Sequence, residues 1–222
     1  MRENCIHITF VIDKSGSMYN SREDVIGGWK STLEKQRAEQ EGECIVSLFT
    51  FSDDVKEVYL GKDINDVSDI NYETGGMTSL YDGIGVAVDR VGQWLSEMDE
   101  ANRPSKNLVV IMTDGAENNS SEYTLERVKE MIKHQEDVYD WTFVYLGTDV
   151  TTLKDVDNLG IKTRGFSARK DMSSTYTILN DTMSAYRMSK TVSEAVATMD
   201  FLASSCLDMT AKYEADNKIK LS

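Results

Sequence analysis

An apolar run that ends in a polar string decides the fold of this chain, and it reads Ile6-His7-Ile8-Thr9-Phe10-Val11-Ile12-Asp13-Lys14-Ser15-Gly16-Ser17. The run is rich in Ile, Val and Phe, which is typical of a strand that helices cover on both faces. Three more runs of this kind follow: Cys44 to Phe51, Asn107 to Thr113 and Trp141 to Leu146. Segments with helical periodicity lie between them. This alternation predicts an α/β fold with a doubly wound, mostly parallel six-stranded sheet and helices on both faces.

A more polar run, Val55 to Leu60, alternates its side chains and follows the turn Ser52-Asp53-Asp54. We expect it to be an antiparallel edge strand. Apolar residues spaced three or four apart predict the helices, the clearest being the stripe of Leu80, Ile84, Val88, Val91 and Leu95. The other expected helices cover Val25 to Arg37, Leu125 to Ile132, Tyr176 to Tyr186, and a short segment from Thr152 to Leu159 that ends at Gly160.

The chain reads as one domain, residues 1–190, with a C-terminal helical extension and a frayed tail over residues 191–222. No Pro/Gly/Ser-rich linker and no internal repeat divides it. The string Thr191-Val192-Ser193-Glu194 has the pattern of a capping box, and apolar residues at helical spacing follow as far as Met209. Three roles stay open for this helix: it folds back onto the domain, pairs with its copy in a dimer, or docks on another protein.

The composition excludes several classes of partner. Lys and Arg number 24 against 38 Asp and Glu, so the formal net charge is −14 over 222 residues. Such an acidic surface repels phosphate backbones and anionic lipids, and we expect neither nucleic-acid nor membrane binding. No apolar run approaches the roughly 18 residues of a membrane span, and the N-terminus lacks the pattern of a signal peptide. With three cysteines at uninformative spacing, we expect reduced thiols and a cytoplasmic location.

Oxygen-bearing side chains follow the first strand in the string Asp13, Ser15 and Ser17. This string sits where the strand turns into a helix, at the carboxyl edge of the sheet, which is where open α/β folds bind ligands. One carboxylate and two hydroxyls are hard donors, suited to Mg²⁺ or Mn²⁺. Taken alone, the string is equally consistent with a serine turn that caps the next helix.

Two further segments bring similar side chains to the same edge. Thr78 precedes the helix that begins near Leu80, and Asp114 follows the strand Asn107 to Thr113. We expect that strand to lie beside the strand that ends at Asp13. Two carboxylates and three hydroxyls from three loops can then gather around one octahedral ion.

Together these motifs resemble the von Willebrand factor A (vWA) family with its metal-ion-dependent adhesion site complete, from Ile6 to about Arg187. The resemblance implies that Asp13, Ser15, Ser17, Thr78 and Asp114 hold a metal ion, directly or through water. It also implies that the ion captures a carboxylate of an acidic-residue-bearing partner protein. We expect Mg²⁺, with Mn²⁺ or Ca²⁺ as alternatives. More narrowly, the segments Gly75 to Asp82, Val144 to Gly147 and Tyr186-Arg187 resemble small stand-alone vWA proteins of bacteria and phages.

Other polar residues support weaker hypotheses. Asp82 lies one helical turn after Thr78, so it either holds a metal-bound water or a hydroxyl ligand in place, or is a first-turn acid that interacts favourably with the helix dipole. Asp53 and Asp54 are typical turn residues, with a role at the partner surface as the alternative. Asn118-Asn119-Ser120 reads as a polar loop beside the site, with partner contact as the alternative, and Lys162, Arg164, Arg169 and Lys170 form a local basic cluster.

The function that this sequence favours is a metal-dependent protein-binding module that is not an enzyme. The alternatives are a structural or assembly component of a phage or bacterial complex and, less favoured, a Mg²⁺-dependent hydrolase. No histidine lies near the motifs to act as a general base, and neither a nucleophile elbow nor a Walker A loop occurs.

Overall fold

We describe a computed structural model of the chain. The structure describes residues 1–39, 42–147, 158–161, 166–167, 172–189, 191, 193–194 and 197. Within this part, strands form one sheet in the order β3-β2-β1-β4-β5-β6. Their bounds are β1 Arg2–Asp13, β2 Glu43–Phe51, β3 Val55–Asp63, β4 Pro104–Thr113, β5 Thr142–Gly147 and β6 Phe166–Ser167.

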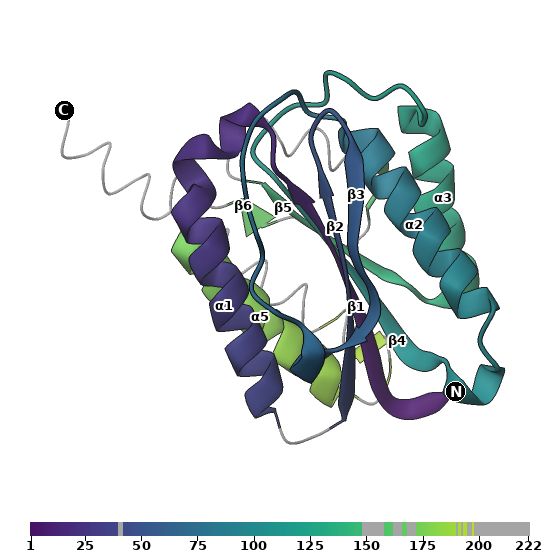
Figure 1. Ribbon diagram of the computed structural model, residues 1–222. Helices are drawn as coiled ribbons and strands as arrows, with labels where there is room; N and C mark the ends of the chain where they lie inside the picture. Colours follow the sequence, from purple (N-terminus) through teal and green to yellow (C-terminus); the bar gives the residue numbers. More distant parts are fainter. Residues whose placement is uncertain are drawn as a thin grey trace, which may run out of the picture.

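β1 lies at the centre of the sheet and is parallel to both of its neighbours. Asp13 is in register with Phe51 of β2, and Ile12 is in register with Met112 of β4. The carboxyl ends of these strands therefore meet at one edge, which is the upper edge in Figure 1. The predicted adjacency of β1 and β4 and the predicted antiparallel edge strand, β3, are both confirmed.

The predicted six-stranded sheet is confirmed only in part, because the sixth strand is very short. Five strands of six to twelve residues make up the sheet, and β6 adds two residues beside β5. The sequence contains five strand-like apolar runs, so a sixth run of comparable length was never visible in it.

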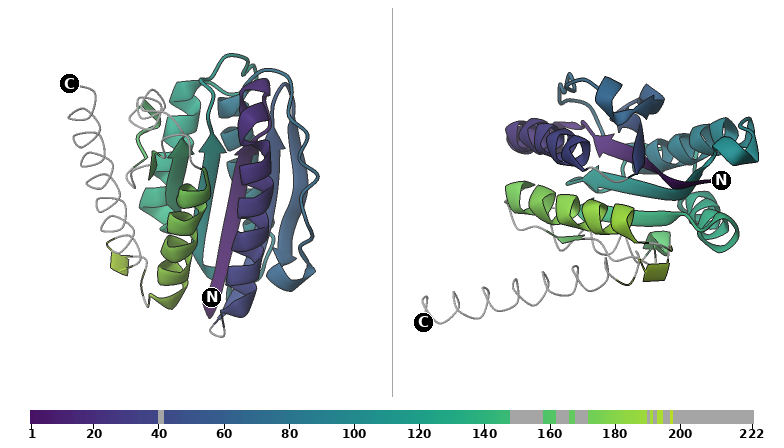
Figure 2. Two further views of the ribbon diagram at one scale, coloured as in Figure 1. Left: turned by 90° about the vertical axis from the view of Figure 1, so that its left-hand side faces the viewer. Right: turned by 90° about the horizontal axis from the view of Figure 1, so that it is seen from below.

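Four long helices cover the two faces of the sheet (Figures 1 and 2). α1 and α5 lie side by side on one face, and α2 and α3 lie on the other. They span α1 Arg22–Ala38, α2 Leu80–Ser96, α3 Leu125–Tyr139 and α5 Met172–Met188, and each agrees with a helix expected from the sequence. Three short 3-10 helices complete the described elements: η1 Gly16–Ser21, η2 Ile64–Asp66 and η3 Glu100–Asn102.

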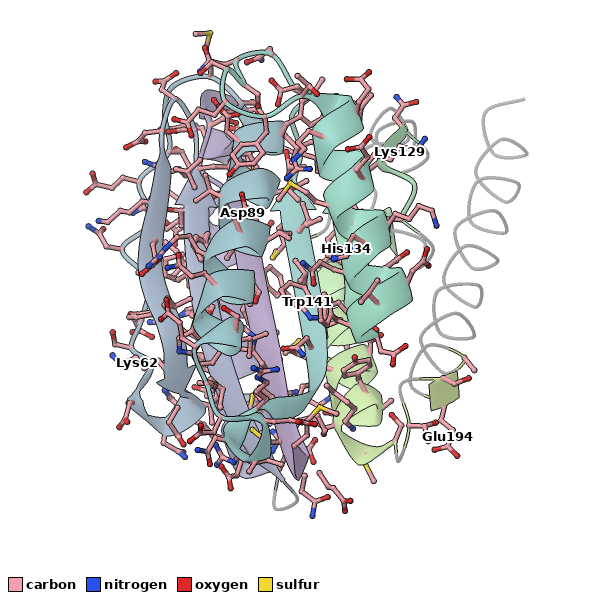
Figure 3. The ribbon with its side chains drawn as sticks, turned by 90° about the vertical axis from the view of Figure 1, so that its right-hand side faces the viewer. Lys62, Asp89, Lys129, His134, Trp141 and Glu194 are labelled. Atoms are coloured by element: carbon pink, nitrogen blue, oxygen red, sulfur yellow. The ribbon has the colours of Figure 1, made fainter. Side chains whose placement is uncertain are left out.

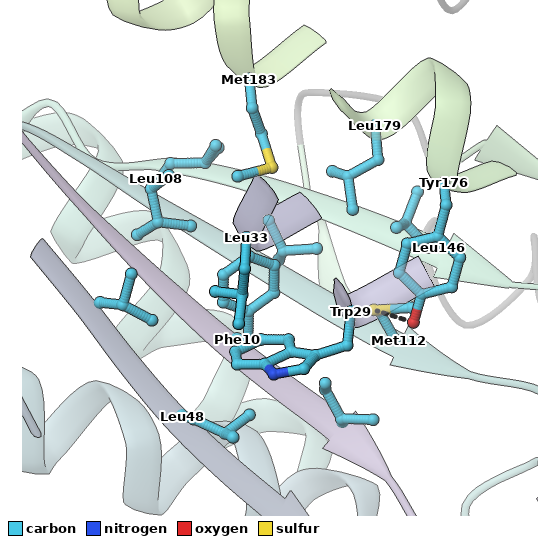
Figure 4. Packing of buried hydrophobic residues seen from close by; sticks show 14 of the residues in the cluster. Phe10, Trp29, Leu33, Leu48, Leu108, Met112, Leu146, Tyr176, Leu179 and Met183 are labelled. Atoms are coloured by element: carbon cyan, nitrogen blue, oxygen red, sulfur yellow. Dashed lines mark hydrogen bonds between the residues drawn. The ribbon is translucent and has the colours of Figure 1, made fainter. Parts of the chain in front are cut away.

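Large side chains fill the layer between the sheet and the α1–α5 pair (Figure 4). Phe10 of β1 meets Trp29 of α1 edge to face, with ring centroids 5.1 Å apart. Tyr176 of α5 is buried there too, and its hydroxyl donates to the sulfur of Met112 at 3.7 Å. The predicted stripe of α2 is buried on the opposite face of the sheet.

Parts of two predicted helices lie outside the described residues. Gly160 has a φ of +73°, as expected of a glycine that ends a helix, but residues 152–157 before it are not described. The Thr191 hydroxyl accepts a hydrogen bond from the Glu194 amide at 3.2 Å, which agrees with the predicted cap of the C-terminal helix. Residues 198–222 lie outside the described part, as does the basic cluster of Lys162, Arg164, Arg169 and Lys170. No helix of the described part is long and apolar enough to cross a membrane.

Candidate metal centre

The carboxylate of Asp13 is fixed at the end of β1. The Ser15 amide donates to Oδ1 at 2.6 Å, and the Thr113 hydroxyl, from the end of β4, donates to Oδ2 at 2.6 Å. The Asp13 side chain is buried, and burial raises its pKa, because the charged form loses contact with water. Asp13 is therefore held rigidly in an environment that disfavours its charge.

Ser15 and Ser17 present their hydroxyls together at the start of η1. Their Oγ atoms lie 2.9 Å apart. Ser15 is the N-cap residue of η1, yet its side chain makes no capping hydrogen bond, and neither does Ser21 before α1. The alternative of a serine turn that merely caps the next helix is therefore wrong.

The loops that carry Thr78 and Asp114 bring their side chains to the same place. A Cβ atom built on Gly115 would lie 2.9 Å from Thr78 Oγ1, 3.0 Å from Ser17 Oγ and 3.5 Å from Asp13 Oδ2. Oxygens from two loops thus surround one small space beside Gly115 of a third loop, and the space stays open because residue 115 has no side chain.

Asp114 borders this space with an unsatisfied oxygen. Its Oδ1 atom is buried and has no hydrogen-bond partner, which is costly for a carboxylate. Burial also raises the pKa of Asp114, and a hydrogen bond from the Ser17 side chain opposes that shift. A divalent cation would supply the missing partner for Asp114 and offset the unfavourable burial of both carboxylates. The residues present therefore fit a metal ion.

The nature of the donors restricts which ion fits. The described residues contain no group of three or more His, Cys, Asp and Glu side chains that could bind a metal. The cluster at this edge instead combines two carboxylates with three hydroxyls, and such hard oxygen donors suit Mg²⁺ or Mn²⁺ better than soft metals. His7 bonds to Ser47 and Asn107, and the ring of His134 on α3 (Figure 3) lies 5.5 Å from that of Tyr139, so these contacts of the two histidines are with residues outside the cluster.

Backbone hydrogen bonds join the Asp13 loop to the Thr78 loop. The Gly16 amide donates to the Gly76 carbonyl at 3.0 Å, and the Gly75 amide donates to the Lys14 carbonyl at 2.8 Å. Gly76 has a φ of +80°, and a Cβ atom there would overlap the Asp53 carboxylate, so this position requires glycine. Asp53 also accepts from the Met77 amide at 2.8 Å. Asp53 therefore fixes the loop that carries Thr78, a role that was not predicted from the sequence.

Asn118 joins the Thr78 loop to the Asp114 loop. Its side-chain oxygen accepts from the Thr78 amide at 2.9 Å, and its own amide donates to the Thr78 carbonyl at 3.0 Å. Sequence analysis placed Asn118 in a polar loop beside the site but did not identify this contact, because nothing local pairs residues 40 positions apart. The two bonds fix the position of Thr78 relative to Asp114.

The same loop caps α2, which has no side-chain cap of its own. Glu117 and Ser120 both accept from the Tyr81 amide, at 3.1 and 3.0 Å, and Ser120 also accepts from the Asp82 amide at 3.1 Å. These bonds satisfy amides that would otherwise lack partners at the helix start. The Asp114 loop is thereby attached to the helix that begins beside Thr78.

Asp82 makes contacts of a different kind from those expected. Its carboxylate accepts from the amides of Ser121, Glu122 and Tyr123 at 2.8 to 3.0 Å. Asp82 thus holds the far end of the Asp114 loop, just before α3. The predicted support of the metal ligands by Asp82 stays a prediction. In the structure, Asp82 positions the loop that leads from Asp114 to α3.

The fold and the site together define a doubly wound α/β domain with a cluster of oxygen donors at the carboxyl edge of its sheet. The sequence profile of the von Willebrand factor type A domain matches residues 7–179, and the chain therefore belongs to this family. Among curated proteins, none matches the chain.

Solved structures share the fold at low sequence identity. Proximal thread matrix protein 1 from the mussel byssus is 16% identical, with a TM-score of 0.56, over 83% of this chain and 47% of that one. It has also been solved with a zinc-occupied MIDAS motif. The PilB minor pilin of Streptococcus sanguinis is 14% identical, with a TM-score of 0.54, over 81% and 61% of the two chains.

The von Willebrand factor domain of the pili tip protein Mfa5 from Porphyromonas gingivalis is 10% identical, with a TM-score of 0.58, over 80% of this chain and 94% of that one. The chain spans about half the length of the thread protein, so these likenesses show the shared fold and not a shared activity.

Proposed function

We propose that Asp13, Ser15, Ser17, Thr78 and Asp114 hold a divalent cation that captures an acidic residue of a partner protein. The observation that carries this proposal is the space beside Gly115, which Thr78 Oγ1, Ser17 Oγ and Asp13 Oδ2 surround and which Asp114 borders with an unpartnered oxygen. Mg²⁺ is the favoured ion, with Mn²⁺ and Ca²⁺ as alternatives. A zinc-occupied site in the similar thread protein supports a metal at this place in the fold.

The donor set favours recognition over catalysis. A cation in this site would supply a Lewis-acidic position that attracts an anion, because three of the five donors are neutral hydroxyls. Asp13 and Asp114 anchor the site, and because burial raises the pKa of both carboxyl groups, a cation would stabilise their charged forms. The described loops around them contribute no histidine that could act as a general base. These features support a binding module over a hydrolase.

The metal site itself is tested by calorimetric titration with Mg²⁺. Asp13→Ala and Asp114→Ala are expected to abolish the binding heat while circular dichroism shows a folded domain. Asp69→Ala removes an exposed carboxylate that pairs with Lys30 instead, and it serves as the matched control with unchanged affinity. Unchanged Mg²⁺ affinity in either site variant contradicts the proposal.

A second candidate function is that of a structural or assembly component, in which the metal site is vestigial or only stabilises the domain and the assembly does not depend on the metal. The names of the similar structures favour it, since they include a minor pilin, a pili tip protein and a thread matrix protein. Size-exclusion chromatography with and without chelator separates the two candidates. An assembly that persists without metal supports this second function.

A cytoplasmic location is part of the main proposal, supported by the free, buried thiols of Cys5 and Cys44, and cell fractionation tests it.

A further inference from the structure

Two exposed apolar side chains lie at the edge that carries the candidate metal site. Within the described part of the chain, six large apolar side chains are exposed: Met1, Tyr19, Met77, Val138, Tyr139 and Met188. Tyr19 is 72% exposed and follows Ser17 by two residues, and Met77 is 51% exposed and directly precedes Thr78. In a 3-10 helix, which rises about 2 Å per residue, Tyr19 stays close to Ser17.

The backbone holds both side chains in place. Met18 is fully buried, which anchors η1 and leaves the neighbouring Tyr19 facing outward. The Met77 amide bonds to Asp53, and the Gly16–Gly76 bond ties η1 to the Met77 loop. Exposed aromatic and methionine side chains on a rigid frame are typical of the centre of a protein interface.

The charges around the site restrict what can approach. In the described loops of this edge (residues 14–21, 52–54, 72–79 and 114–124), Lys14 is the only basic residue, and it pairs with Asp54 at 3.2 Å. Arg22, the next residue along the chain, donates to the Tyr72 carbonyl at 2.9 Å and pairs with Glu23 at 2.8 Å. The same loops carry six carboxylates: Asp53, Asp54, Glu73, Asp114, Glu117 and Glu122. A strongly acidic segment would therefore be repelled by the rim even if one of its carboxylates reached the metal.

We propose that the partner is a short segment with a single coordinating carboxylate, apolar side chains next to it that contact Tyr19 and Met77, and basic residues further out. This inference rests on the proposed metal site and adds the class of ligand that the site selects. The metal would bind the carboxylate of the segment, and Tyr19 and Met77 would select for its apolar side chains. The acidic rim would repel segments with several acidic residues.

The test uses a pool of short peptides with a fixed central Asp or Glu and random flanks, passed over the immobilised Mg²⁺-loaded full chain. We expect retained peptides to be enriched in apolar residues beside the fixed acid and in Lys and Arg beyond them. The double variant Tyr19→Ser/Met77→Ser is expected to lose about tenfold in affinity for the selected peptides while keeping its Mg²⁺ affinity.

A matched control is available at the opposite edge of the sheet. Tyr139 ends α3 and Met188 ends α5, and they are 57% and 66% exposed. Tyr139→Ser/Met188→Ser removes the same residue types and is expected to retain the peptides like the wild type.

The outcomes separate the two levels of the proposal. One outcome overturns this inference but leaves the proposed metal function intact. In that outcome, retention of peptides needs Mg²⁺ and the central acid, but the retained peptides show no apolar enrichment or still bind the Tyr19→Ser/Met77→Ser variant. Retention that persists with chelator, or with the central Asp replaced by Asn, overturns both. Retention of no peptide overturns the inference, since it states that one short segment suffices.

Discussion

Thr78 is held on both sides of its peptide by one residue from a different loop. The side chain and the backbone of Asn118 each bond to the backbone of Thr78. The position of the Thr78 hydroxyl in the oxygen cluster therefore depends on Asn118, which is not itself one of the five expected ligands. Loss of a residue that orients a metal ligand typically lowers metal affinity by about 10- to 100-fold. Asn118 is therefore the position at which a change outside the ligand set should affect metal binding most.

We expect Asn118→Ala to lower Mg²⁺ affinity by about tenfold, because the Thr78 loop loses one of its two ties. Asn118→Asp keeps an oxygen that can accept from the Thr78 amide and should retain most of the affinity. Calorimetric titration measures both. Asn119→Ala is the control, since the Asn119 side chain bonds to Ser79 instead. Equal affinities in all three variants would show that the Asn118 bonds do not position Thr78.

His7 is a buried histidine whose role is structural. Its Nε2 atom lies 2.8 Å from the Ser47 hydroxyl, and its Nδ1 donates to the Asn107 side chain at 3.3 Å. Burial lowers the pKa of His7 from 6.5 to about 4, because the imidazolium form loses hydration, and the bond to Asn107 opposes this only in part.

This pKa shift predicts how stability depends on pH. The unfolded chain takes up a proton at residue 7 below pH 6.5, whereas the folded chain does so only near pH 4. The contribution of neutral His7 to the free energy of unfolding is therefore present above pH 6.5 and is lost as the pH falls toward 4. It amounts to about 3 kcal/mol. Urea unfolding of wild type and His7→Gln across this range measures it.

The variant should show a smaller loss of stability between pH 6.5 and 4 than the wild type does. His134→Gln, at an exposed position on α3, should follow the wild-type slope. A slope in His7→Gln that matches the wild type would contradict the assignment of this proton uptake to His7.

At the scale of elements, the contact between α1 and α5 depends on a glycine. A Cβ atom on Gly28 would overlap the ring of Tyr176, so the absence of a side chain lets the two helices approach closely. Lys106 fixes the other end of α5, where its ammonium donates to the carbonyls of Tyr186, Arg187 and Ser189 at 2.7 to 2.8 Å. α5 is thus held to the body of the domain at both ends.

We expect Gly28→Ala to lower the free energy of unfolding by about 1–3 kcal/mol, because the added methyl group displaces Tyr176 from its packing. Gly27→Ala is the matched control on the same helix, since a Cβ atom there meets nothing within 4 Å. That variant should gain up to about 1 kcal/mol from helix propensity. Urea denaturation compares the two, and a stabilising Gly28→Ala would show that α5 is free to shift.

The sequence allowed prediction of the elements but not of the contacts between their loops. The stripe of α2 is visible because apolar residues recur every three or four positions. The strands β1, β2, β4 and β5 are visible because each is a short, nearly continuous apolar run. The same logic placed Asp13, Ser15 and Ser17 at the sheet edge, together with Thr78 and Asp114. The roles of Asn118 and Asp82 could not be predicted, because they depend on hydrogen bonds to backbone amides about 40 residues away.

At the scale of the whole molecule, the candidate site lowers the stability of the metal-free fold. The chain carries a formal net charge of −14, and it still buries Asp13 and leaves Asp114 Oδ1 without a partner at one edge of its sheet. A buried carboxylate oxygen without a hydrogen-bond partner is unfavourable, and Asp114 Oδ1 is such an atom at the place where the three loops meet. A bound cation would offset this cost, so metal binding and global stability are coupled.

This coupling predicts that Mg²⁺ raises the melting temperature. At a concentration one hundred times the dissociation constant, binding adds about 2.7 kcal/mol to the folded state. For a chain of this size, that corresponds to a shift of roughly 5–10 °C.

Asp13→Asn keeps an oxygen for the Ser15 amide and removes the buried charge. We therefore expect it to melt no lower than the metal-free wild type and to show no shift with Mg²⁺. Thermal unfolding followed by circular dichroism, with and without chelator, measures both effects. A wild-type melting temperature that Mg²⁺ leaves unchanged, or an equal Mg²⁺ shift in Asp13→Asn, would mean that the oxygen cluster at this edge does not hold the ion.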